Sequence, residues 1–185
     1  MQNNSSNVCP VERAGALDSS LRRWIQNPKR ILKKYLKSGD KVLDLGCGPG
    51  FFTIDIAQLV GQSGLVYAAD VQEGMLDKVR KKIATQSLEN IHVHKCEEST
   101  INLNDTVDFI LAFYMIHEIP DQNRTFSEIK KLLNPNGKVL IIEPNFHVTK
   151  HDFQNMIGRL EKVGFKIIDK PKIFFSRSVL LQNDN

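Results

Sequence analysis

Glycine and carboxylate residues that could hold a nucleotide-like ligand are concentrated between residues 42 and 70. The apolar run Val42–Leu45 leads into a loop with glycines at alternate positions, Gly46, Gly48 and Gly50. Glycine has no Cβ, so a ligand can lie directly against the backbone of such a loop. Asp70 ends a second apolar run further along the chain. At that distance from a glycine loop, its carboxylate could accept both hydroxyls of a ribose.

The spacing of the glycines separates two classes of ligand. Dinucleotide-binding loops follow the pattern G-x-G-x-x-G, whose last glycine lets a pyrophosphate reach the N-terminus of the next helix. Here the pattern is G-x-G-x-G, and Phe51 occupies the position of the last dinucleotide glycine. The loop therefore favours an amino-acid moiety with a sulfonium over a pyrophosphate. The alternative is a doubly wound domain whose glycines serve only packing.

The nine residues Val42–Gly50 resemble motif I of the class I S-adenosylmethionine (SAM) methyltransferases. Asp70 resembles the acidic residue of their motif II, and Val71–Met75 resemble the segment that packs on the adenine. The turn Leu133–Val139 looks like the L-x-P-G-G-x-hydrophobic turn of the same enzymes. Within them, the resemblance is greatest to the small-molecule group that includes the ubiquinone and menaquinone biosynthesis methyltransferases. It implies SAM as cofactor and S-adenosylhomocysteine as product.

The cofactor should lie where strand order reverses, at the carboxyl ends of the parallel strands. The resemblance and this topology together predict the cofactor-binding residues Asp44, Gly46, Cys47, Gly48, Gly50, Asp70, Val71, Met75, Cys96, Glu97, Ala112 and Phe113. Asp44 is expected to brace the glycine loop by hydrogen bonds to its backbone. Those enzymes usually carry Gly-Asp-Ala after the third strand, whereas this chain has Lys95–Glu98. The adenine contact then passes to Glu97, to Glu98 or to the backbone.

Polar side chains that follow the predicted fourth and fifth strands could act on a methyl acceptor. The catalytic candidates are His117, Tyr114 and Glu143. His117 occupies a position where related small-molecule enzymes often have a histidine. It could accept a proton, because an unperturbed histidine titrates near neutrality. The alternative is a residue at a helix start that is satisfied by backbone. Glu143 could orient a substrate or pair with a buried hydroxyl.

Three histidines could also hold a metal. His117, His147 and His151, with carboxylates near them, could act as ligands for zinc, iron, nickel or cobalt. Thr149 is predicted to cap a helix between His147 and His151, so these two need not share a helical face. We therefore assign no metal, and keep the three-histidine set as an alternative.

Apolar runs and helical periodicity alternate along the chain. The predicted strands are Lys41–Leu45, Leu65–Ala69, Ile91–His94, Val107–Phe113, Lys138–Glu143, Phe165–Asp169 and Ile173–Gln182. The predicted helices are Pro28–Leu36, Gly50–Val60, Glu73–Thr85, Asp121–Leu133 and Thr149–Val163. This alternation predicts a Rossmann-like, doubly wound α/β sheet. The last two strands lack an intervening helix and should be antiparallel, and the resemblance implies the order 3-2-1-4-5-7-6.

A single globular domain over residues 1–185 is expected, because the chain is 41% hydrophobic and 25% charged. Residues 1–37 are predicted to form a helical lid over the site, with Leu17, Leu21 and Trp24 on one apolar face. The stretch Leu21–Ser38 is basic. It is either the solvated face of an amphipathic helix or a surface for a partner.

The remaining sequence features narrow the class of protein. The start lacks the basic and apolar regions of a secretory signal, and Val107–Ile116 is too short an apolar run to span a membrane. Three cysteines without C-x-x-C spacing suggest the cytoplasm.

The expected activity is methyl transfer from SAM to a small or medium-sized acceptor, free or presented by a partner. A nucleic-acid substrate is disfavoured, because Phe113–Ile116 does not match the N/D-P-P-Y/F motif of amino methyltransferases. An RNA or protein methyltransferase, or a non-catalytic SAM-binding module, remains the alternative. The oligomeric state is left open.

Overall fold

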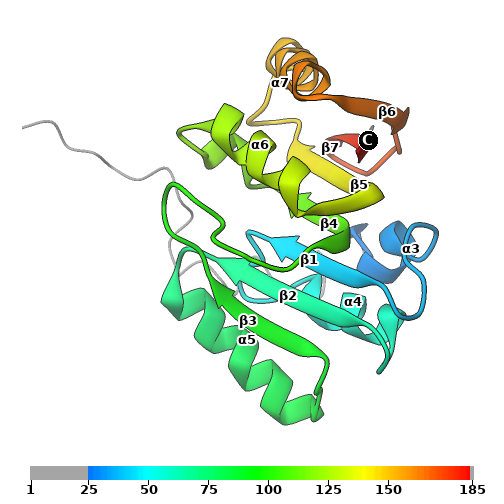
Figure 1. The fold of residues 1–185 in the computed structure, drawn as a ribbon, viewed down its shortest axis with the longest axis vertical. Helices are drawn as coiled ribbons and strands as arrows, with labels where there is room; N and C mark the ends of the chain where they lie inside the picture. The colour runs from blue at the N-terminus through cyan, green and yellow to red at the C-terminus, as the bar shows by residue number, and fades with distance from the viewer. Residues whose placement is uncertain (1–24, 184–185) are drawn as a thin grey trace, which may run out of the picture.

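The computed structural model describes residues 25–183. Its centre is a seven-stranded sheet of order β3-β2-β1-β4-β5-β7-β6 (Figure 1). The strands are β1 (Lys41–Leu45), β2 (Leu65–Asp70), β3 (Ile91–Lys95), β4 (Val107–Phe113), β5 (Leu133–Pro144), β6 (Phe165–Asp169) and β7 (Ser176–Asn183). Neighbouring strands are parallel except that β7 is antiparallel to both β5 and β6. The predicted fold class and strand order are confirmed.

Helices cover both faces of the sheet (Figure 1). They are α3 (Pro28–Leu32), α4 (Thr53–Val60), α5 (Glu73–Gln86), the short 3-10 helix η2 (Ile116–Glu118), α6 (Gln122–Leu132) and α7 (Lys150–Val163). One apolar core joins the sheet to α3, α4 and α5, and a second joins it to α6 and α7. Strands β1 and β4 lie between these two cores. Their near-continuous apolar runs follow from burial on both faces.

Several predicted boundaries differ from the structure. The helix from Pro28 ends at Leu32 rather than Leu36, because the chain turns tightly there and buries Leu36 before β1 begins. The turn predicted at residues 134–137 lies inside β5, where the register with β4 jumps from Val107 opposite Leu133 to Phe109 opposite Lys138. The four residues between form a bulge in which Asn136 has a φ of 64°.

The last strand begins at Ser176, not at Ile173. Phe175 has a φ of 53°, which is outside the range of a strand, so a regular ladder begins only after it. Phe174 and Phe175 are consequently in a turn before β7. Across residues 25–183, no helix has both the length and the apolar character needed to cross a membrane.

Candidate active site

The glycine loop follows β1 and is held against β2. The backbone N–H groups of Gly46 and Cys47 both donate to Ala69 O, at 2.8 and 3.0 Å. Gly46 has a φ of 68°, and a Cβ there would lie 2.8 Å from the side chain of Met115. A Cβ on Gly48, whose φ is 53°, would meet no atom within 4 Å. The loop is therefore closely packed at Gly46 and open above Gly48, which leaves room for a ligand against the backbone.

Asp70 joins the end of β2 to this loop. Its Oδ2 accepts a hydrogen bond from Gly48 N at 2.8 Å, and its Oδ1 accepts one from Gln72 N at 2.9 Å. The residue is 8% exposed, and burial raises its pKa above the usual aspartate range. Each carboxylate oxygen has capacity for a further hydrogen bond. The group therefore fits the predicted role of receiving ribose hydroxyls.

Asp44 lies beneath the loop at the end of β1. Its Oδ2 accepts a hydrogen bond from Thr53 Oγ1 at 2.6 Å, which ties β1 to the first turn of α4. Burial raises the pKa of this carboxyl to about 7. The expected bracing of the loop backbone therefore differs from what the structure shows. The loop N–H of Gly48 goes to Asp70, and Asp44 supports the helix that follows the loop.

The other predicted cofactor residues lie at or just after the carboxyl ends of β1, β2, β3 and β4, except Met75, which lies in the first turn of α5. Cys47, Met75, Cys96, Ala112 and Phe113 are buried, and Val71 is partly buried. Cys96 N donates to Asp70 O at 3.0 Å, which brings the end of β3 next to the acid. Glu97 is exposed in a tight turn in which it exchanges backbone bonds with Thr100. Its contact with adenine stays a prediction.

A row of aromatic rings follows the end of β4. Phe113 stacks on Tyr114 with ring centroids 4.1 Å apart and lies 4.5 Å from the ring of Phe52. Tyr114 has a φ of 58°. Its hydroxyl accepts a hydrogen bond from Gln26 Nε2 and is 2.7 Å from Ser176 Oγ. The hydroxyl of this catalytic candidate therefore joins the chain before α3 to the start of β7.

This cluster was missed in the sequence because its members lie far apart along the chain. Gln26 and Ser176 are 88 and 62 residues from Tyr114. The polar residue types alone carried no signal. Sheet order could have suggested the contact with Ser176, because the end of β4 and the start of β7 lie on either side of the end of β5.

His117 and Glu143 form a pair at the carboxyl ends of β4 and β5. Glu143 is fully buried; its Oε1 accepts from Ile116 N at 2.9 Å, and its Oε2 contacts His117 Nδ1. The hydrogen bond to Glu143 raises the pKa of His117, against the opposite effect of burial. With Nδ1 held as a donor, Nε2 of the neutral ring is a proton acceptor. The side chain of His117 is 26% exposed and therefore only partly covered.

A cavity of about 230 Å³ adjoins the pair. Its polar lining comprises His117, Gln122, Glu143, His147, Asp152 and Arg159. The rings of His117 and His147 are 5.8 Å apart. Within residues 25–183, no three histidine, cysteine, aspartate or glutamate side chains gather as metal ligands. His117, His147 and His151 are therefore not gathered into one ligand set in this part of the chain.

Known proteins with similar sequences and structures agree with this architecture. The family described as "Methyltransferase domain" matches residues 36–172. A demethylmenaquinone methyltransferase from Lactobacillus johnsonii is 36% identical over 118 residues, which are 62% of this chain and 48% of the relative. One from Staphylococcus saprophyticus is 30% identical over 149 residues, which are 78% of this chain and 63% of the relative.

The chain thus spans about half the length of several curated relatives it matches. A solved structure, a SAM-dependent methyltransferase from Aquifex aeolicus, is matched over nearly its whole length. Its TM-score is 0.87 at 29% identity, and the match covers 95% of this chain and 99% of that one. The family match, the strand order and the glycine loop lead to one assignment: the chain belongs to the methyltransferase domain family, among the class I SAM-dependent methyltransferases.

Proposed function

We propose that this protein transfers the methyl group of SAM to a ring carbon of a reduced quinone, with His117 as general base. The observation that carries the proposal is the His117–Glu143 pair, which lies at the same sheet edge as the glycine loop. The demethylmenaquinone methyltransferases among the relatives support a quinone-type acceptor.

The residues present fit SAM. The open backbone above Gly48 would accommodate the amino-acid moiety, and Asp70 would receive the ribose hydroxyls. Buried Met75 and the turn after Cys96 would hold the adenine. When bound, SAM supplies an electrophilic methyl: its C–S bond breaks as the new C–C bond forms, and sulfur keeps the electron pair in S-adenosylhomocysteine.

The protein's part in the chemistry is proton removal. A hydroquinone ring carbon is a better nucleophile when the neighbouring hydroxyl has lost its proton. His117 Nε2 takes that proton, and buried Glu143 stabilises the imidazolium that results. After transfer, the ring carbon loses its proton to solvent, the ring oxygen regains a proton from the His117 imidazolium, and the ring is aromatic again. Methyl transfer is otherwise an in-line displacement, for which positioning supplies much of the rate.

Replacing the base tests the proposal. In His117→Ala, transfer of labelled methyl to a soluble hydroquinone should fall roughly 100-fold or more, because general-base catalysis is lost. Affinity for SAM, measured by calorimetry, should not change. Wild-type turnover in His117→Ala would contradict the role of His117 as general base. Wild-type activity that falls when a chelator is added would support the metal alternative. If no acceptor in a fractionated cell extract takes up label, the chain is a SAM-binding module.

We also propose that the predicted lid over residues 1–37 closes on this edge. Residues 1–24, with Leu17, Leu21 and Trp24, lie outside the described part of the chain. In the described part, buried Gln26 donates to both the Tyr114 hydroxyl and Phe174 O, which links this segment to the site. SAM should therefore shift tryptophan fluorescence and protect residues 1–30 from protease. Identical digestion with and without saturating SAM would contradict the lid.

The compartment is part of the same proposal. Cys47 and Cys96 are both free thiols in the described chain. Free, buried thiols support a reducing compartment such as the cytoplasm.

A further inference from the structure

Three exposed phenylalanines gather beside the site. Phe146 is 70% exposed, and Phe174 and Phe175 are each 58% exposed. Phe146 belongs to the loop between β5 and α7, and the other two belong to the turn before β7. Asn145 N donates to Phe175 O at 3.1 Å, so the two segments are held together. Large apolar side chains that cluster in solvent mark an interaction surface.

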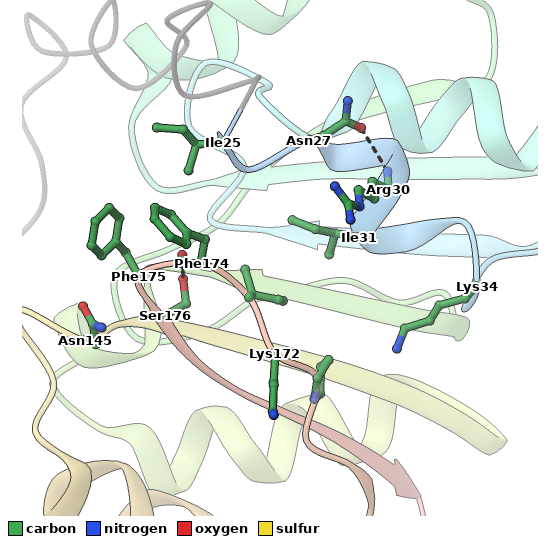
Figure 2. Close-up of a pocket in the computed structure, with 12 residues that line it drawn as sticks. Ile25, Asn27, Arg30, Ile31, Lys34, Asn145, Lys172, Phe174, Phe175 and Ser176 are labelled. Atoms are coloured by element: carbon green, nitrogen blue, oxygen red, sulfur yellow. Dashed lines mark hydrogen bonds between the residues drawn. The ribbon is translucent and has the colours of Figure 1, made fainter.

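A groove of about 970 Å³ extends from this cluster between α3 and the turn before β7 (Figure 2). Its apolar lining includes Ile25, Ile31 and Ile173. Cations from both sides also line it: Arg30 and Lys34 from the α3 region, and Lys172 from the turn. Phe174 and Phe175 line one end. The groove therefore offers an aliphatic floor with positive charge along its sides.

The charge of this face is mainly positive. Segments 25–37, 145–150 and 170–177 meet here, and each contains lysine or arginine but no aspartate or glutamate. Asp169 stands next to the third segment, but its Oδ2 is already 3.3 Å from Lys34 Nζ and accepts from the Tyr35 hydroxyl. The exposed rings thus lie in a cationic setting, although the whole chain has a net charge of only +4.

We propose that this face docks on the surface of an anionic lipid bilayer. The rings of Phe146, Phe174 and Phe175 would enter the boundary between headgroups and acyl chains, and the aliphatic groove would take an acyl chain. The cations would meet lipid phosphates. This is interfacial binding, which needs no membrane-spanning helix. It does not depend on which acceptor the enzyme uses.

The geometry of the rings favours a bilayer over RNA. A platform for bases needs flat aromatic faces on which successive bases can stack. Here Phe174 and Phe175 are tilted by 56° with centroids 4.1 Å apart, so they cover one another. Phe146 stands edge-on to Tyr114, at 89°. An aliphatic groove between cations suits a lipid chain and its headgroup better than a stacked base.

Vesicle co-sedimentation of the full chain tests the proposal. Wild type should pellet with phosphatidylcholine vesicles that contain phosphatidylglycerol, and much less with phosphatidylcholine alone. Lys172→Glu changes the charge by two at the surface and should lower the partition constant roughly 30-fold, since each unit of charge contributes about fivefold. Lys81→Glu is the matched control, because Lys81 is exposed on α5, which packs on β2 and β3 near the other edge of the sheet. It should bind like wild type.

A second pair of variants tests the phenylalanines. The double change Phe174→Ser with Phe175→Ser should lower partition at least about tenfold, whereas Phe174→Leu with Phe175→Leu should retain most binding because the apolar surface remains. Circular dichroism and the unfolding temperature check that each variant is folded.

Several results would overturn the proposal. Wild type that stays in the supernatant with anionic vesicles refutes it directly, and an equal loss in Lys81→Glu reduces it to general charge attraction. If the wild type binds a homopolymer RNA but no vesicles, and Lys172→Glu loses that RNA binding, the surface is for RNA. If light scattering instead shows a dimer that the serine variants dissociate, the occupant is a second copy of this chain.

Discussion

The buried carboxyl of Asp44 should make the stability of this protein depend on pH. Asp44 is 2% exposed, and burial raises its pKa from 3.8 to about 7. In the unfolded chain the group ionises near its ordinary value, whereas in the folded protein it keeps its proton up to neutrality. As pH rises from about 4 to 7, the unfolded state therefore gains stability relative to the folded one. The contribution of this group is most favourable to folding in acid and declines toward neutral pH.

The size of the effect follows from the two pKa values. Each pH unit between the ordinary and the folded pKa changes the free energy of unfolding by about 1.4 kcal/mol. Between pH 5 and pH 8, Asp44 should thus lower the free energy of unfolding of the wild type by about 3 kcal/mol. Asp44→Asn cannot ionise and still accepts the hydrogen bond from the Thr53 hydroxyl, so it should lose this part of the pH dependence.

Urea unfolding followed by circular dichroism at pH 5, 6, 7 and 8 measures the effect. The informative quantity is the wild-type minus Asp44→Asn difference in unfolding free energy at each pH, since other titrating groups act on both proteins. Thr53→Ser keeps the hydroxyl and should follow the wild type. Thr53→Val removes a hydrogen bond that lowers the pKa of Asp44, so the unfolding free energy of this variant should go on falling to higher pH than that of the wild type. Parallel curves for wild type and Asp44→Asn would refute the reasoning.

Three other substitutions test the site. Asp70→Ala should weaken SAM binding in calorimetry by at least about 1.5 kcal/mol, because charge-assisted contacts are lost; unchanged affinity would count against the cofactor site. Gly46→Ala should lower the unfolding free energy by at least about 2 kcal/mol, and by more than Gly48→Ala does. Both glycines have a left-handed backbone, but only at Gly46 would the added Cβ meet a neighbouring side chain, so equal losses would contradict this reasoning. Glu143→Gln should move the acidic limb of the rate profile to lower pH, because Glu143 raises the pKa of His117. A limb that stays in place would mean that His117 is not the base.

Local sequence patterns predicted most strands and helices, and the family resemblance supplied the strand order. Strand β4 was predicted to the residue, because a near-continuous apolar run between turns is typical of a strand buried on both faces. The glycine loop and Asp70 were recognisable because their spacing is set by one βαβ unit. The hydrogen bond from Gly48 to Asp70 then follows from the pairing of β1 with β2.

Contacts between distant segments were harder to predict. His117 and Glu143 were both candidates, but their pairing depends on two loops meeting beyond the ends of β4 and β5. The exposed pair Phe174 and Phe175 was read as strand, because aromatic residues favour strands and no local signal announces a left-handed backbone at a phenylalanine. The partner of Asp44 was also missed, because it depends on how α4 leaves the loop.

The reactivity of the Cys47 thiol can report how often the cofactor loop opens. Burial raises the pKa of Cys47 well above that of a free thiol, and raises that of Cys96 to about 12. Only the thiolate reacts readily with alkylating reagents, so modification at neutral pH must wait until the chain opens locally. With Cys9 and Cys96 replaced by serine, the rate at which iodoacetamide labels Cys47 counts the openings of the loop, and bound SAM should make them rarer.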